Sequence, residues 1–166
     1  MKANPILIIS GEPYSIFFEI FTKTINSRFI KKIKNPIVLI GSKNLLYKQI
    51  QKLNYNNKIE VIDKNKINKI NKNHKIIKII DVNFNFKKTF DKISSSSSKY
   101  IEECFDIAIN LLKRNKNLKL ISGPISKKHF LKKKYPGITE YLSKKTNSQK
   151  MTKLLFNGQV IYDMII

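Results

Sequence analysis

The sequence of 166 residues has one cysteine, Cys104, two histidines, His74 and His129, and no tryptophan. A single thiol excludes a disulfide framework and a cluster of thiolate metal ligands, and it is typical of a reducing compartment. Because a catalytic metal site usually takes three protein ligands, we expect no metal site built from this chain alone. Cys104 is expected to be buried, and the two histidines, which lie in lysine-rich stretches, to be ordinary surface residues.

Long apolar runs are also absent. The apolar stretch 6–9 is too short for a signal sequence or a membrane span. No later stretch reaches the roughly 18–20 residues that a helix needs to cross a bilayer. We therefore expect a cytoplasmic protein without membrane association.

Arginine is scarce in a chain whose net charge is +22, because only Arg28 and Arg114 stand among its 33 basic residues. The lysines are mixed with asparagine and isoleucine throughout, which is the pattern of an AT-biased genome. Surfaces built for nucleic acid use the arginine fork and aromatic stacking, and no zinc-finger or RNP-type motif occurs here. A basic nucleic-acid-binding protein is therefore the third and least favoured hypothesis, and no specific nucleic-acid partner is expected.

What is present is an alternation of apolar, strand-like runs with amphipathic segments. With 42% hydrophobic residues the chain can bury one core, so we expect a single α/β domain over 1–166. Strands are predicted at 6–10, 36–41, 59–62, 76–81 and 118–121, and helices at 14–26, 44–53, 99–114, 126–133 and 138–145.

Capping and turn residues refine this pattern. Ser98, the last residue of a serine run, is expected to cap the helix over 99–114, and Ser126 to cap the next one. The low-complexity tract 64–75 is expected to be a surface excursion. Apolar stretches on both sides of Asn157-Gly158 indicate a hairpin.

Three short polar segments carry more information than the composition does. The first reads Ser-Gly-Glu-Pro at 10–13 and places Glu12 after a strand, where open α/β sheets bind ligands. The second reads Ser-Gly-Pro-Ile-Ser-Lys at 122–127, where a glycine permits close backbone approach and a helix start with Lys127 favours an anion. The third reads Tyr-Pro-Gly-Ile-Thr-Glu-Tyr-Leu at 135–142. Each segment is a weak signal when it stands alone.

In this order and spacing, the three segments resemble the 4-hydroxythreonine-4-phosphate dehydrogenase family of vitamin B6 biosynthesis. Its members read Gly-Glu-Pro, then Gly-Pro-Ile-x-Lys, then Gly-His-Thr-Glu. The stretch 122–142 is the most specific part, and a looser resemblance extends over 6–157. This covers nearly all of the chain but only half of a family member, so the chain is expected to be a truncated, N-terminal half.

The resemblance implies a three-layer α/β/α fold like that of isocitrate and isopropylmalate dehydrogenases, in a homodimer with active sites near the interface. Family members oxidise the secondary alcohol of 4-phosphooxy-threonine with NAD or NADP. The resulting β-keto acid loses carbon dioxide to give 3-amino-2-oxopropyl phosphate. A divalent metal assists by stabilising the alkoxide and then the enolate. The family's three metal-binding histidines belong to the half that is missing here.

Carried over residue by residue, the resemblance implies a substrate pocket that includes Gly123, Lys127 and Thr139, with Thr139 in contact with the substrate. Glu12 and Glu140 also fit the motifs, and Glu12 is a candidate for the same pocket. No catalytic or cofactor-binding residue is assigned in this chain.

Two positions depart from the family pattern. Its substrate-binding histidine is replaced by Ile138, which neither donates a hydrogen bond nor titrates, and bulky residues at 14–18 follow Gly-Glu-Pro. Two hypotheses therefore stand ahead of nucleic-acid binding. Either the chain works as a dehydrogenase together with a complementary C-terminal chain, or it is a degenerate relative that binds a phosphorylated ligand or a partner chain without chemistry.

Overall fold

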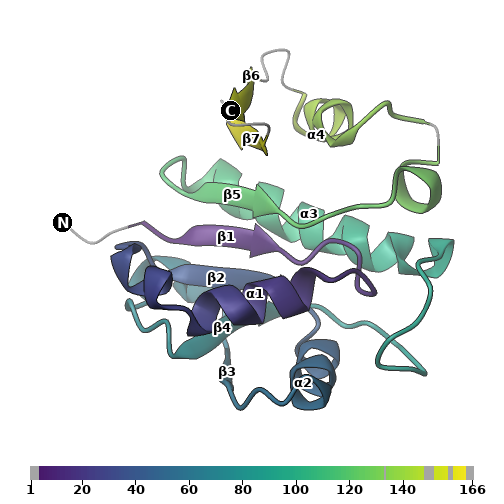
Figure 1. Ribbon diagram of the computed structural model, residues 1–166. Helices are drawn as coiled ribbons and strands as arrows, with labels where there is room; N and C mark the ends of the chain where they lie inside the picture. The colour runs from purple at the N-terminus through teal and green to yellow at the C-terminus, as the bar shows by residue number, and fades with distance from the viewer. Residues whose placement is uncertain (1–3, 133, 148–151, 157–158, 164–166) are drawn as a thin grey trace.

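The computed structural model describes residues 4–132, 134–147, 152–156 and 159–163 (Figure 1). Its central sheet has parallel strands in the order β3-β4-β2-β1-β5. These strands are β1 (Ile6–Ile9), β2 (Ile37–Gly41), β3 (Lys58–Val61), β4 (Ile76–Asp81) and β5 (Lys119–Ser122). Each lies within one or two residues of a predicted strand.

Helices cover both faces of this sheet. The α-helices are α1 (Phe17–Asn26), α2 (Lys43–Lys52), α3 (Ser98–Arg114) and α4 (Ile138–Thr146), and the short helices are η1 (Arg28–Lys32), η2 (Lys64–Lys69), η3 (Ser95–Ser97) and η4 (Lys127–Leu131). α1 packs against α2 on one face, and α3 crosses the opposite face against β1 and β2 (Figure 1). This arrangement confirms the predicted three-layer α/β/α class.

The two strands beside β1 are reached by connections that run over opposite faces of the sheet. The chain passes from β1 through α1 to β2, whereas β5, on the other side of β1, is reached from β4 through α3 on the opposite face. The sheet is therefore doubly wound, and its topological switch point lies between β1 and β5. Ligands of open α/β sheets bind outside the carboxyl ends of the strands at such a point. The motifs at 10–13 and 122–127 follow these two strands.

The long helix α3 contributes the largest helical part of the core. Its apolar residues recur every three or four positions and form one face, as expected of an amphipathic helix. Ile101, Cys104, Phe105 and Ala108 on this face are fully buried. Each large side chain of this kind contributes about 1.5–3 kcal/mol by leaving water. Burial also raises the pKa of Cys104 to about 12, so the thiol stays protonated and the predicted buried role is confirmed.

The predicted start of α1 near Tyr14 is wrong, since the helix begins at Phe17. Residues 11–16 instead form a turn, in which Ser15 Oγ donates to the backbone carbonyl of Glu12 at 2.7 Å. The turn holds these residues at the end of β1, and for this reason the helix starts later than its apolar periodicity indicates.

The predicted cap of α3 is also wrong. Ser98 is the first residue of the helix, and its Oγ donates to the backbone carbonyl of His129 at 3.2 Å. Ser126 does cap the next segment, because its Oγ accepts from the backbone N–H of His129 at 3.1 Å. The helix predicted to reach 133 is instead the short η4, which ends where Lys132 adopts a left-handed conformation with φ of 48°.

The tract 64–75 is the predicted surface excursion, but two of its residues anchor it. Ile67 is buried, and His74 is half-buried with its two ring nitrogens close to backbone carbonyls. His129 is half-buried as well. The prediction of an ordinary surface histidine is therefore wrong for His74, because backbone carbonyls of Ile30 and Asn35 contact its ring.

The predicted C-terminal hairpin is present as β6 (Thr152–Phe156) paired antiparallel with β7 (Gln159–Asp163), and its Asn157-Gly158 centre lies outside the described residues. Across the described ranges, no helix combines the length and the apolar character that crossing a membrane requires.

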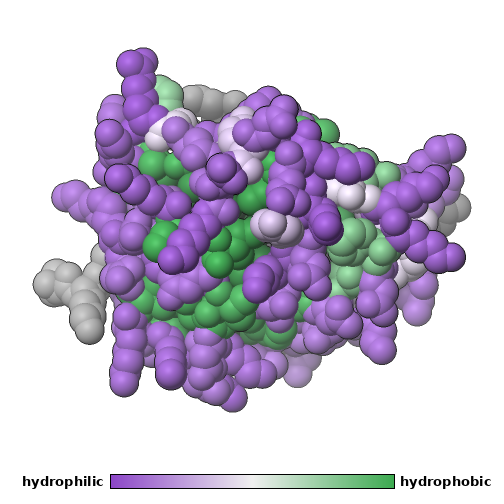
Figure 2. All heavy atoms as spheres, turned by 90° about the horizontal axis from the view of Figure 1, so that it is seen from below, coloured by the Kyte–Doolittle hydropathy of each residue, from purple (hydrophilic) through white to green (hydrophobic). Residues whose placement is uncertain are grey.

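Apolar side chains remain exposed at both edges of the sheet. Val61 on the edge strand β3 is 49% exposed, and Ile121 on the edge strand β5 is 51% exposed. Figure 2 views the molecule from the side of α2 and β3 and shows an apolar area bordered by hydrophilic side chains. The described chain thus leaves apolar surface in contact with solvent, as expected for half of a larger fold.

Candidate functional site

The turns that follow β1 and β5 touch at the switch point. The backbone N–H of Glu12 donates to the carbonyl of Pro124 at 2.8 Å, and that of Gly123 donates to the carbonyl of Ile9 at 2.7 Å. The motifs at 10–13 and 122–127, more than a hundred residues apart in sequence, are therefore joined through their backbones.

Two glycines make this close contact possible. Gly11 has a φ of 69°, and a Cβ there would lie 2.3 Å from the carbonyl oxygen of Pro124. A Cβ on Gly123 would lie 2.4 Å from the carbonyl oxygen of Ser10. Because the obstructing atoms are backbone, no side-chain rotation could relieve either contact. The structure therefore gives Gly123 a packing role in addition to its predicted place in the pocket.

The second and third motifs enclose a cavity of about 590 Å³ beside this junction. Its lining brings together Gly123, Lys127, Ile138 and Thr139, which are four of the five predicted substrate-pocket residues, and it also includes Glu140. The remaining lining residues are Ser122, Pro124, Ile125, Leu131, Pro136 and Gly137. The volume is within the range of about 300–1,000 Å³ that is usual for small-molecule sites.

The chemistry of this lining suits a small anionic substrate that also carries hydroxyl groups. Lys127 supplies a positive charge, the hydroxyl of Thr139 both donates and accepts hydrogen bonds, and the carboxylate of Glu140 accepts them. Ile138 is half-buried and presents an apolar surface where a histidine would be polar. The lining therefore offers a cation, a hydroxyl and a carboxylate beside an apolar surface.

The wall that carries the third motif is held against α3. Lys145 of α4 pairs with Glu102 at 2.8 Å and with Asp106 at 2.9 Å, both on α3. These carboxylates raise the pKa of Lys145. The ring of Tyr141 packs edge-on against Phe105, with ring centres 5.5 Å apart. These contacts fix the start of α4, and with it Thr139, relative to the sheet.

Glu12 lies behind the cavity and not in its lining, and it is only 2% exposed. Its Oε1 accepts a hydrogen bond from Ser97 Oγ, and the same hydroxyl lies 2.9 Å from the carbonyl oxygen of Ser94. One hydroxyl proton cannot fully satisfy both oxygens. The carboxyl group of Glu12 therefore shares this donor with a backbone carbonyl.

Burial disfavours the charged form of Glu12. Desolvation raises the pKa of Glu12 above its usual range and outweighs the opposing effects of Ser97, His129 and the Ser126 backbone. Its second oxygen, Oε2, is buried without a hydrogen-bond partner, which an ionised carboxylate would tolerate poorly. In this position Glu12 ties the start of α3 to the turn after β1.

Sequence reasoning missed a second buried link at this end of the sheet. Tyr100 Oη lies 2.8 Å from Ser10 Oγ and accepts from the backbone N–H of Ser42 at 2.9 Å, so it connects the ends of β1 and β2 to α3. Burial raises the pKa of Tyr100 well above its usual value, so the phenol stays neutral. The sequence did contain a signal for this link. Ser97 and Tyr100 each lie one helical turn before a residue of the buried face, Ile101 and Cys104 respectively.

A metal does not fit the described part of the chain. Within it, no three His, Cys, Asp or Glu side chains gather closely enough to hold an ion. The cavity contributes one carboxylate, Glu140, and neither His74 nor His129 is among its lining residues. A divalent metal would therefore need ligands that these residues do not supply.

Comparisons with known proteins agree with this geometry. The family model of the pyridoxal phosphate biosynthetic protein PdxA matches residues 32–164. No curated protein sequence gives a match. A 4-hydroxythreonine-4-phosphate dehydrogenase from Burkholderia phymatum is similar in structure, with a TM-score of 0.77 and 20% identity, over 93% of this chain and 47% of that one.

Two further solved structures show the same likeness. A putative 4-hydroxythreonine-4-phosphate dehydrogenase from Salmonella typhimurium has a TM-score of 0.73 and 21% identity, over 96% of this chain and 50% of that one. The enzyme from Klebsiella pneumoniae has a TM-score of 0.73 and 19% identity, over 93% and 48%. Identities this low show a shared fold, and the chain spans about half the length of each of these proteins.

Proposed function

The chain belongs to the family of the pyridoxal phosphate biosynthetic protein PdxA, and we propose that it forms the substrate-binding, N-terminal half of a 4-hydroxythreonine-4-phosphate dehydrogenase. In this reaction the secondary alcohol of 4-phosphooxy-threonine loses a hydride to NAD or NADP and a proton to the enzyme. The β-keto acid then releases carbon dioxide to give 3-amino-2-oxopropyl phosphate. The cavity that joins Gly123 and Lys127 to Thr139 at the switch point carries the proposal.

Each lining residue receives a role that its chemistry allows. We assign Lys127 to the phosphate or carboxylate of the substrate, because it brings a full positive charge to the rim. Thr139 would hydrogen-bond the substrate, and Ile138 would contact it through apolar surface. Gly123 would admit the substrate close to the backbone, while Glu12 would hold the wall behind the cavity in place.

The proposal requires a second half. A divalent cation would stabilise the developing alkoxide, but the described residues do not supply its ligands. The described residues also include no recognisable dinucleotide-binding loop. We propose that both come from a C-terminal half, whether in the same protein or in a complementary chain, in a cytoplasmic assembly that is a homodimer in its complete form. The exposed Ile121 on the edge strand β5 is available for such a contact.

A complementation assay tests this function. The purified chain is mixed with 4-phosphooxy-threonine, NAD or NADP and a divalent metal, with and without the separately expressed C-terminal half of a family enzyme, and reduced cofactor is followed by absorbance. We expect turnover in the mixture of both halves and none with the chain alone. Turnover by the chain alone would show that the missing ligands are not needed.

A second candidate is a degenerate relative that binds a phosphorylated ligand without catalysis. The replacement of a polar, titratable histidine by Ile138 favours it. Absence of turnover with both halves present, together with saturable binding of 4-phosphooxy-threonine, would favour the degenerate relative over the dehydrogenase.

Substitution of Lys127 tests the cavity independently of turnover. Lys127→Met is expected to weaken binding of 4-phosphooxy-threonine about tenfold or more, because a charge-assisted contact of about 1.5–3 kcal/mol is lost. Lys128→Met is the matched control, since Lys128 is equally exposed but does not line the cavity. Calorimetric titration of both variants checks the prediction, and equal losses would show that the contribution of Lys127 is only its charge.

A further inference from the structure

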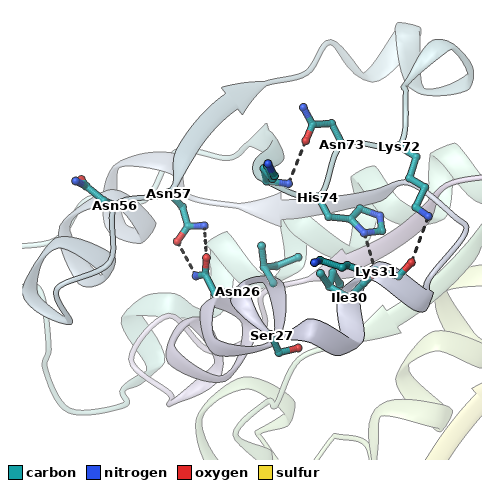
Figure 3. Close-up of a pocket in the computed structure, with 11 residues that line it drawn as sticks. Asn26, Ser27, Ile30, Lys31, Asn56, Asn57, Lys72, Asn73 and His74 are labelled. Atoms are coloured by element: carbon teal, nitrogen blue, oxygen red, sulfur yellow. Dashed lines mark hydrogen bonds between the residues drawn. The ribbon is translucent and has the colours of Figure 1, made fainter.

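A second cavity lies at the opposite end of the sheet from the proposed substrate site. It encloses about 630 Å³ between the end of α1, η1 and the segments that lead into β3 and β4 (Figure 3). It therefore opens at the amino ends of the strands, and none of its lining residues belongs to the three motifs. Nothing in the proposed dehydrogenase reaction uses it.

His74 is held in a fixed position at one side of this cavity. Its Nδ1 lies 3.1 Å from the carbonyl oxygen of Ile30, and its Nε2 lies 3.0 Å from the carbonyl oxygen of Asn35. A carbonyl can only accept, so a ring nitrogen that carries a proton donates to it. These contacts hold the ring between η1 and the start of β2.

Three lysines from two segments join His74 around the cavity. Lys31 comes from η1, while Lys72 and Lys75 flank the histidine, and Lys72 Nζ reaches across to the carbonyl of Lys31 at 3.5 Å (Figure 3). No aspartate or glutamate belongs to the lining, and none of the ion pairs found in the described part of the chain involves these lysines. Like charges gathered without a carboxylate repel one another unless an anion binds between them.

The opposite wall is made of amides in a fixed geometry. Asn26 and Asn57 hydrogen-bond each other in both directions, at 2.9 and 3.1 Å, so their side chains cannot turn freely (Figure 3). Such an amide pair leaves the second N–H of Asn57 available as a donor. The cavity therefore offers cations on one side and oriented donors on the other.

We propose that this cavity binds a compact polyanion of the di- or triphosphate class. The volume, the cationic side and the amide wall match the size and the acceptor-rich surface of such a ligand. A nucleic-acid duplex fits less well, because it needs an extended basic surface and these groups gather at a single pocket. The abundance of lysine in the whole chain explains exposed charge, but it does not explain the bonded positions of His74 and Asn57.

Titration of the full chain with inorganic pyrophosphate, followed by amide and side-chain NMR, tests this site. At about 0.1 M salt, where distant surface charges are largely screened, we expect saturable shifts centred on His74 and Asn57. The double variant Lys31→Glu/Lys72→Glu should weaken binding about tenfold or more. The control Lys87→Glu/Lys88→Glu makes the same change in net charge at exposed positions outside the cavity, and should alter binding less than about twofold.

A neutral substitution supplies a second readout. Asn57→Leu removes the amide donor without changing charge, and should weaken pyrophosphate binding by about fivefold or more. Equal losses in the two lysine variants, or unsaturable shifts spread over the surface, would overturn the proposal in favour of diffuse attraction between a basic protein and any polyanion. The titration measures no turnover, so its result is independent of the proposed dehydrogenase function.

Discussion

Gly123→Ala is expected to lower the free energy of unfolding by about 3 kcal/mol or more, because the new methyl group has no space. Its Cβ would lie 2.4 Å from the carbonyl oxygen of Ser10 and 2.8 Å from that of Ile9. Both atoms belong to the backbone around the end of β1, which is hydrogen-bonded on either side. Relief would require β1 and β5 to separate at the switch point, and the cavity beside them would deform as well.

Urea unfolding followed by circular dichroism measures this loss, with Gly137→Ala as the matched control. A Cβ on Gly137 would approach only the carboxylate end of Glu140, at 3.0 Å, and that flexible side chain can move away. We expect the control to change stability by less than about 1 kcal/mol. If the two variants lost equal stability, the close backbone contact at Gly123 would not be a feature of the folded chain.

The second large effect is a loss of stability as the pH rises, caused by Glu12. Burial raises the pKa of Glu12 in the folded chain above its ordinary value of 4.5. Above pH 4.5 the unfolded chain therefore releases this proton while the folded chain keeps it. Stability contributed by the neutral acid is complete below pH 4.5 and falls as the pH rises towards the folded pKa.

Glu12→Gln is expected to remove this pH dependence. An amide oxygen can accept from Ser97 Oγ as the carboxyl oxygen does, but the amide never ionises. Near neutral pH the variant should be more stable than the parent by about 1–3 kcal/mol, the cost of burying an ionised group without full hydrogen bonding. In acid the two should be alike. Chemical unfolding across a pH series measures the difference.

Glu19→Gln serves as the control for Glu12, since the side chain of Glu19 is 37% exposed and its ion pair with Lys23 at 2.6 Å lies at the surface. Surface pairs of this kind contribute about 0–1 kcal/mol, so a small and opposite change is expected. A Glu12→Gln variant that is less stable than the parent at neutral pH would show that the hydrogen bonds of Glu12 favour its charged form by more than burial disfavours it.

Local patterning was sufficient to predict most of the fold. The strands are short apolar runs between turn residues, and α3 repeats its apolar residues at helical spacing, so both follow from side-chain period alone. The errors lie at helix ends. Ser98 was expected to cap α3, but it points to the backbone of His129, which is a contact between segments distant in sequence.

The candidate site was predicted in part, from the order of sequence motifs and not from side-chain period. Lys127, Thr139 and Gly123 were proposed from motif order, and the structure places all three on one cavity. Glu12 was proposed from the same kind of evidence, yet it is buried behind that cavity. Whether any of these residues contacts substrate stays a prediction. Motif spacing indicates which segments are near one another, but not which side chains face the solvent.

The sequence by itself determined the α/β class, the resemblance carried by the three motifs, and a supply of thiols and histidines too small for a metal centre. These properties depend on residue type and on local spacing. Only the tertiary structure decided the raised pKa of Glu12, the packing role of Gly123 and the contacts of His74. Each of these depends on a backbone carbonyl or a hydroxyl from a distant segment, and such partners are chosen when the sheet and helices pack, not by local sequence.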